Sequence, residues 1–235
     1  MPMMPALTKH FDVWGADFRG HGNSTLPASG DLAWTSFADD VLAVVDHIGA
    51  PDIRAFGHSM GGTSILLADK KRPGTFDKAW LYEPIIFPPS IVPRNSMMAE
   101  NASKRRREFD SRADALHRYA SKPPLGVMRA DALAAYVEYG FHDTDSSAVT
   151  LACAPETEAA VFNGAGTNVD DIADVQIHAT IACGYSVDGP NPAEFAGPTA
   201  DALDHARLVQ YDALGHFGPM QDPVRIANDV VDFLA

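Results

Sequence analysis

Segments with the patterns of buried strands and of helices alternate along this chain, and this alternation restricts the possible folds most strongly. Apolar runs typical of strands lie at 11–18, 53–58, 78–84, 176–184 and 206–214. Helical patterns mark 35–49, 60–71, 198–206 and a final segment with Asp222 at its cap position and Pro223 in its first turn. Strands that alternate with helices favour a mostly parallel, doubly wound sheet, so we predict an α/β fold.

A long interruption separates the first three of these strands from the last two. Residues 88–170 contain helix-like stretches with prolines between them. We therefore predict an α/β core made of 1–87 and 171–235, with 88–170 folded as a helical cap insertion. A cap of this kind excludes water from the site beneath it and shapes the substrate pocket.

The sequence Gly57-His58-Ser59-Met60-Gly61 lies at a junction between a predicted strand and a predicted helix, and it fits the pattern G-x-S-x-G. A serine at the apex of so tight a turn has strained backbone angles. The residues two before and two after it must be small so that the chain can close beneath it. The turn raises the Ser59 hydroxyl into a cleft and directs the N-terminus of the next helix at developing negative charge. We predict that Ser59 is a nucleophile.

A serine hydroxyl needs a base, and among the nine histidines His216 has the most suitable position. It lies in the sequence LGHFGPMQDP, between the last predicted strand and the last predicted helix. In a doubly wound sheet such a loop lies at the carboxyl edge of the strands, where ligands bind. We therefore predict that His216 takes the proton from Ser59.

Three segments, DVWGADFRGHGNS, FGHSMGG and LGHFGPMQDP, resemble the α/β-hydrolase superfamily, specifically its esterase and haloperoxidase-like branch. The resemblance covers residues 11–235. It implies that Ser59 attacks, that His216 is the general base and that the backbone N–H of Met60 is one donor of the oxyanion hole. Epoxide hydrolases and haloalkane dehalogenases of this fold use an aspartate nucleophile. The serine at position 59 therefore excludes both of these enzyme classes.

The resemblance also implies an acidic residue that orients His216, and the sequence offers two candidates. The family usually carries this acid in the loop after the strand at 176–184, often as G-x-x-D. Here the loop reads CGYSVDGP, which places Asp188 one residue later. The alternative is Glu83, at the end of the strand at 78–84. We expect Asp188 to hold the imidazole in its tautomer, and its replacement by Asn to reduce turnover severely.

The resemblance further implies strands before 11–18, and a loop after them that donates a second oxyanion N–H. Neither is found in this sequence. The last of these strands would lie between 11–18 and 53–58, so these two segments are not expected to be neighbours. Three explanations stay open: a natural chain that starts upstream, a gap closed by rearrangement or by a strand from a partner in a homo-oligomer, and a noncatalytic relative.

Composition and charge exclude several other functions. A formal net charge of −13 creates no field that would attract nucleic acid. No dinucleotide fingerprint or phosphate loop indicates a cofactor, and the two cysteines lack the spacing of zinc ligands. We expect reduced cysteines, no signal peptide and no membrane span, which favours a cytoplasmic protein.

These features together predict a serine hydrolase that cleaves carboxylic esters or related small acyl compounds through an acyl-enzyme on Ser59. Lactones, thioesters and C–C diketones are cleaved with the same three residues, so lactonase, thioesterase and C–C hydrolase activities stay open. A protein of the same fold that binds a ligand without catalysis is the alternative from another functional class.

Overall fold

The computed structural model describes residues 2–91, 97–185 and 191–235. Its central sheet has four parallel strands in the order β1-β2-β6-β7, namely Arg54–His58, Lys78–Tyr82, His178–Gly184 and Ala206–Tyr211. The register aligns His58 with Tyr82 and Tyr82 with Ala182, so the carboxyl ends of the strands meet at one edge of the sheet. The parallel α/β sheet predicted from the sequence is confirmed.

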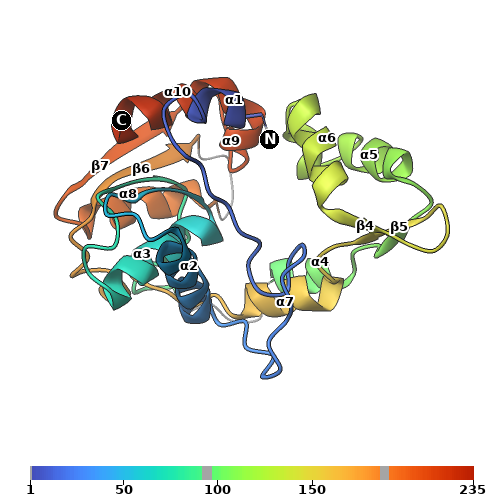
Figure 1. Cartoon of the computed structure of the whole chain (residues 1–235), viewed down its shortest axis with the longest axis horizontal. Coiled ribbons are helices and arrows are strands. Elements are labelled where there is room, and N and C mark those ends of the chain that lie inside the picture. Colours follow the sequence, from blue (N-terminus) through green and yellow to red (C-terminus); the bar gives the residue numbers. More distant parts are fainter. Residues whose placement is uncertain (1, 92–96, 186–190) are drawn as a thin grey trace.

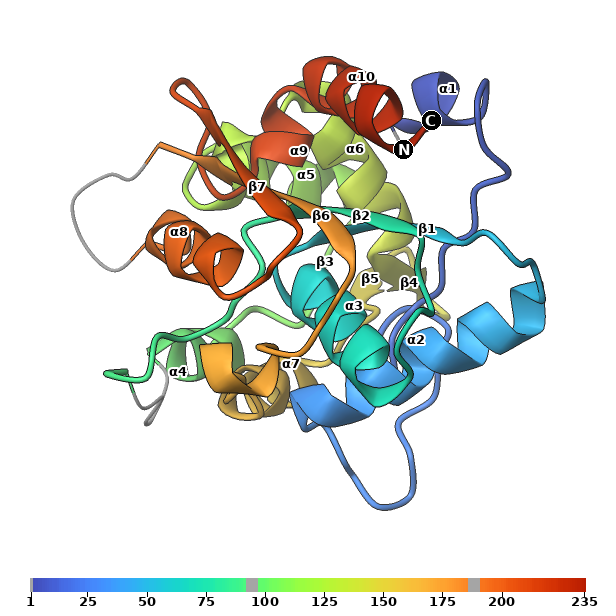
Figure 2. The ribbon, with the colours of Figure 1, turned by 90° about the vertical axis from the view of Figure 1, so that its left-hand side faces the viewer.

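Helices cover both faces of this sheet (Figure 2). On one face lie α2 (Trp34–Ile48), α3 (Met60–Lys71) and α8 (Ala193–Asp201). On the other face lie α1 (Met4–Leu7) and α10 (Pro223–Leu234), which pack against each other. The doubly wound arrangement therefore encloses the sheet between two apolar cores.

Strand β2 shows how the sheet separates these cores. Ala79 and Leu81 pack in the core with α2, α3 and α8, whereas Trp80 and Tyr82 pack in the core with α1 and α10. All four side chains are at most 1% exposed, so β2 is buried on both faces. A parallel strand in such a position reads as a continuous apolar run, which is why it was recognisable in the sequence.

The strand predicted at 11–18 is wrong. Within the described part of the chain, no backbone N–H from 12 to 18 donates a hydrogen bond to the protein. Among the described residues β1 pairs with β2 alone, and its other side borders a groove of about 940 Å³ that residues 11–19 and α2 also line. The two segments are not neighbours, as the resemblance implied, and an extended segment without a partner strand has no ladder to hold it.

The segment between β2 and β6 has an apolar core of its own and extends to one side of the sheet (Figure 1). Its elements in chain order are α4 (Met97–Ser103), β3 (Glu108–Phe109), α5 (Arg112–Ala120), η1 (Leu125–Val127), α6 (Ala130–Tyr139), β4 (Phe141–Asp143), β5 (Val149–Leu151), α7 (Pro155–Asn163) and η2 (Val169–Asp171). Strands β3, β5 and β4 form an antiparallel sheet, so the inserted segment combines the predicted helices with a small sheet that was not predicted. Strands this short show no alternation that sequence reasoning could detect. The boundaries at 88 and 170 stay a prediction.

The predicted start is confirmed for the last helix, α10, and is wrong for α8. α10 begins at Pro223, and the side chain of Asp222 accepts a hydrogen bond from the backbone N–H of Arg225, as predicted for its N-cap. α8 begins at Ala193 rather than at Pro198, so that this proline lies inside the helix. Proline prefers the first turn of a helix, and this preference predicts a start for α8 that lies five residues too late.

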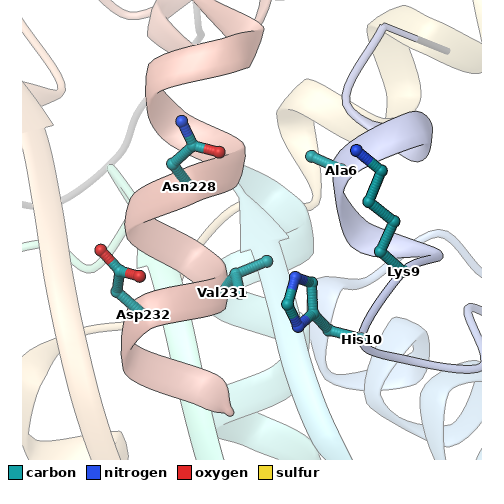
Figure 3. A pocket seen from close by; sticks show the side chains of 6 residues that line it. All are labelled: Ala6, Lys9, His10, Asn228, Val231 and Asp232. Atoms are coloured by element: carbon teal, nitrogen blue, oxygen red, sulfur yellow. The ribbon is translucent and has the colours of Figure 1, made fainter.

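A pocket of about 420 Å³ lies between α1 and α10 (Figure 3). Its lining residues are Ala6, Lys9, His10, Asn228, Val231 and Asp232. It contains neither the predicted nucleophile nor the predicted base, so it does not mark the predicted site.

A short helix, α9 (Gly218–Gln221), precedes α10. Over the described ranges, no helix combines the length and apolar character needed to cross a membrane.

Candidate active site

Ser59 occupies a strained turn between β1 and α3. Its backbone has φ 54° and ψ −124°, a combination that residues other than glycine rarely adopt. The turn is fixed because the Ser59 N–H donates to the carbonyl of Tyr82 at 2.9 Å, and the Ser59 carbonyl accepts from Gly62 and Thr63 at 3.0 and 3.2 Å. The strained backbone predicted for Ser59 is therefore confirmed, and the surrounding hydrogen bonds account for its persistence.

The glycines that allow this turn are not the pair that the motif suggests. A Cβ atom on Gly57 would lie 2.7 Å from the backbone N and Cα of Gly62, so β1 and α3 could not approach each other as they do. A Cβ atom on Gly62 would lie 3.1 Å from the side chain of Pro84. Gly61 has no neighbouring atom within 4 Å of that position, and it lines the groove beside β1. The expectation that Gly61 must be small is wrong.

Glu83 holds the imidazole of His216. Nδ1 of His216 lies 2.5 Å from Oε2 of Glu83, which directly follows β2, has φ 44° and is 0% exposed. The other oxygen, Oε1, accepts a hydrogen bond of 2.7 Å from the N–H of Gly184, the last residue of β6. An ionised carboxylate only accepts hydrogen bonds, so Nδ1 of His216 carries its proton and Nε2 is the basic atom.

Asp188, the acid that the resemblance led us to expect, lies outside the described residues. The structure places the alternative, Glu83, at His216. The sequence carries a signal for Glu83, because this charged residue directly follows the apolar run of a strand buried on both faces. A buried carboxylate needs hydrogen-bond or charge partners, and the partners of Glu83 are His216 and Gly184.

The loop that carries His216 is anchored by side chains that the sequence analysis did not identify as functional. Oη of Tyr82 donates to the carbonyl of Gly215 at 2.8 Å, and the N–H of Gly215 donates to Oε1 of Gln221 at 2.8 Å. Nε2 of His58 lies 2.8 Å from the carbonyl oxygen of His216. The contacts of Tyr82 and His58 join residues that are far apart in sequence, so no local pattern could have revealed these two.

Ser59 and His216 lie at the same edge of the sheet. The ring of His58, the residue before Ser59, has its centroid 4.7 Å from that of His216. Among the described residues, no hydrogen bond joins the hydroxyl of Ser59 to His216, and the N–H of Met60 donates to no protein acceptor. Catalytic hydrogen bonds are often long before substrate binds. A hydroxyl, an oriented imidazole and an N–H at a helix start are the groups that acyl transfer requires.

The two thiols offer no competing nucleophile. Cys153 and Cys183 are free cysteines. Burial raises the pKa of each thiol to about 11, with nearby Glu158 and Glu83 adding to the effect in Cys153 and Cys183 respectively. Both therefore stay protonated at neutral pH. Over the same described ranges, no group of three or more His, Cys, Asp or Glu side chains could hold a metal ion.

Comparison with known sequences points to one family. The profile of the alpha/beta hydrolase fold family matches residues 1–144. A curated protein of Pseudomonas savastanoi pv. phaseolicola, named as carbamate hydrolase RutD, is 27% identical over 236 residues, which cover 98% of this chain and 86% of that protein.

Solved structures of hydrolases share the same fold. E-2-(acetamidomethylene)succinate hydrolase superposes with a TM-score of 0.82 at 20% identity, over 99% of this chain and 85% of its own. Esterase RhEst1 from Rhodococcus sp. ECU1013 superposes with a TM-score of 0.71 at 21% identity, over 100% of this chain and 84% of its own. At these identities the likeness shows the fold and does not assign a substrate.

Proposed function

Because this chain belongs to the alpha/beta hydrolase fold family, we propose that it is a serine hydrolase that cleaves carboxylic esters or related small acyl compounds. One observation carries the proposal: a buried carboxylate holds Nδ1 of His216 at 2.5 Å, on the same sheet edge as the strained turn at Ser59. A strained non-glycine backbone costs about 1–3 kcal/mol, so stability does not explain the turn at Ser59. A serine nucleophile needs a base within reach and a third group that orients this base.

The proposed reaction passes through an acyl-enzyme. Oγ of Ser59 attacks the carbonyl carbon of the substrate while Nε2 of His216 takes the hydroxyl proton. The negative charge on the carbonyl oxygen is stabilised by the N–H of Met60 at the start of α3. The tetrahedral intermediate collapses, and the imidazolium of His216 protonates the leaving alcohol. Water then attacks the acyl group on Ser59, with His216 again as base.

Glu83 is the acid of this proposed triad. Its carboxylate keeps the proton of His216 on Nδ1, so that Nε2 is basic, and it stabilises the imidazolium formed during each step. The N–H of Gly184 fixes the carboxylate from its other side. Asp188 stays the second candidate for this role, and the experiment on both acids opens the Discussion.

The segment between β2 and β6 is proposed to act as a cap over the site. Val161 of α7 shares an apolar cluster with Trp34 and Phe37 of α2, and Met60 packs against this cluster. The indole N–H of Trp34 also donates to the carbonyl of Val161 at 2.7 Å. α7 therefore shares an apolar cluster with Met60, the residue that would donate to the oxyanion, and a cap at this place would exclude water.

The relative with 27% identity favours carbamates as a second substrate class, because its printed name is that of a carbamate hydrolase and the match covers 98% of this chain. A carbamate carbonyl is attacked by the same serine, and the substrates differ in the group beside the carbonyl. Turnover of 4-nitrophenyl acetate, butyrate and carbamate under identical conditions ranks the two classes. Faster turnover of the carbamate than of both esters would replace the ester proposal.

Labelling with a fluorophosphonate tests the nucleophile directly. We expect the intact mass of the chain to increase by one adduct, and the Ser59→Ala variant to show none. His216→Ala is the second variant, and its rate of labelling should fall because the hydroxyl loses its base. A folded wild-type chain that binds substrate analogues without forming an adduct would instead favour a noncatalytic binding protein.

A further inference from the structure

His58 lies between Gly57 and Ser59, and its ring contacts the loop that carries the proposed base. Its Nε2 is 2.8 Å from the carbonyl oxygen of His216, and the two rings are 4.7 Å apart. A carbonyl oxygen only accepts, so Nε2 of His58 carries a proton and donates it. The contact therefore requires a hydrogen on Nε2 of His58.

The surroundings of His58 keep it neutral. Burial, followed by the charge of His216, lowers the pKa of His58 to about 3. The rings of Tyr82 on β2, and of His216 and Phe217 in the loop, lie 6.0, 4.7 and 6.4 Å from the ring of His58. Of these neighbours, Tyr82 and His216 are titratable, and Glu83 faces His216 from its Nδ1 side. A second imidazolium beside His216 would oppose the charge that His216 acquires when it takes a proton.

The hydrogen bond from His58 differs from the other two anchors of the loop. Tyr82 and Gln221 both bind the peptide groups of Gly215, one residue before the base. His58 binds the carbonyl of His216 itself, and it is covalently joined to Ser59. His58 therefore links the backbone of Ser59 to the carbonyl of His216 through a single side chain.

We propose that His58 is a positioning residue, whose neutral Nε2–H holds the backbone of His216 so that the imidazole meets both Glu83 and Ser59. This rests on the proposed function, in which His216 is the base. His58 does not exchange protons with the substrate; it fixes the distance between nucleophile and base without adding a charge. If His216 is misplaced, kcat falls while KM changes little, because the proton transfer is affected and substrate binding is not.

Two variants at His58 separate the hydrogen bond from the packing. Gln places an amide nitrogen at nearly the reach of Nε2 and keeps a neutral donor, whereas Leu fills similar space without a donor. We expect His58→Leu to lower kcat for 4-nitrophenyl acetate by about tenfold, the effect of one lost hydrogen bond, with little change in KM. His58→Gln should recover most of this loss. His117→Leu, on the exposed side of α5, is the control for replacing a histidine by leucine and should leave kcat unchanged.

A second readout does not depend on turnover. The proton between Nδ1 of His216 and Glu83 gives a downfield proton resonance, which we expect to weaken or shift in His58→Leu and to be retained in His58→Gln. If wild type shows this resonance but no turnover and no fluorophosphonate adduct, the proposed function fails while this measurement still tests the role of His58. If His58→Leu does not fold, His58→Asn, whose amide is too short to reach, takes its place against His58→Gln. Equal kcat and an equal resonance in wild type and in the variant that cannot make the bond (His58→Leu or His58→Asn) would overturn the proposal. Equal losses in that variant and in His58→Gln would overturn it as well.

Discussion

Replacement of Glu83 by Gln changes one atom of the side chain and tests the acid of the site. The carboxylate accepts two hydrogen bonds, one from the N–H of Gly184 at 2.7 Å and one from Nδ1 of His216 at 2.5 Å. An amide of the same shape has one oxygen, so only one of these donors can keep its acceptor. The other donor then faces an NH₂ group inside the protein.

Each orientation of the new amide has a calculable consequence. If its oxygen faces Gly184, the NH₂ group faces Nδ1, and His216 must take the tautomer with its proton on Nε2. A triad with this wrong tautomer loses a factor of roughly 10⁴ in kcat. If the oxygen faces His216, the N–H of Gly184 loses its acceptor, which costs roughly 1–3 kcal/mol of folding free energy. We therefore expect a large loss of kcat, a moderate loss of stability, or both.

The assay compares Glu83→Gln with Asp188→Asn, using 4-nitrophenyl acetate turnover and the free energy of unfolding in urea. If Glu83 is the acid, the first variant loses kcat and the second stays close to wild type. Turnover that survives in Glu83→Gln and disappears in Asp188→Asn, with both chains folded, would refute the argument from the Glu83 hydrogen bonds. Equal large losses would mean that both carboxylates support the base.

Three further predictions concern pH, packing and backbone exchange. Burial lowers the pKa of His58 from 6.5 to about 3. Between these pH values the unfolded chain therefore binds a proton at His58 that the native chain does not bind. The free energy of unfolding should then fall by up to about 1.4 kcal/mol per pH unit as the pH decreases from about 6.5 towards 3. Urea unfolding of wild type and His58→Gln between these pH values measures it, and identical pH dependence would contradict it. Gly57→Ala should destabilise the fold by about 1–3 kcal/mol through overlap with Gly62, whereas Gly61→Ala, in open space within a helix, should stabilise it by up to about 1 kcal/mol; thermal melting of the pair decides. In hydrogen exchange, amides 12–18 should exchange faster than those of β6, and comparable protection would show that they are hydrogen-bonded in solution.

The elements that sequence predicts well are those whose local pattern and tertiary position agree. α3 runs from Met60 to Lys71, as predicted, because its start is set by the turn at Ser59 and its end by the approach to Pro73. The strand at 78–84 was recognisable because both of its faces are buried. These assignments needed no knowledge of distant contacts.

The predictions that are wrong concern features that depend on contacts outside the local sequence pattern. The segment 11–18 has the apolar residues of a strand, but a strand also needs a partner on the sheet, and its pattern carries no information about that partner. The antiparallel sheet of the inserted segment depends on pairing between Glu108–Phe109 and Val149–Leu151, which lie far apart in the chain. Gly61 was expected to be crowded because the motif names it, whereas the contact is made by the next residue, Gly62.

The sequence offers two candidates for the acid, and the sheet order explains why Glu83 can reach His216. β2 lies between β1 and β6, so a residue that directly follows β2 is adjacent both to the turn at Ser59 and to the end of β6. Gly184 ends β6, where a Cβ atom would lie 2.3 Å from the carbonyl oxygen of Leu214, so the loop that leads to His216 passes directly over the end of this strand. That close approach brings His216 to the carboxylate of Glu83, which directly follows the neighbouring strand β2. A larger residue at position 184 would displace the loop and separate Glu83 from His216, even though position 184 contributes no side chain to the site.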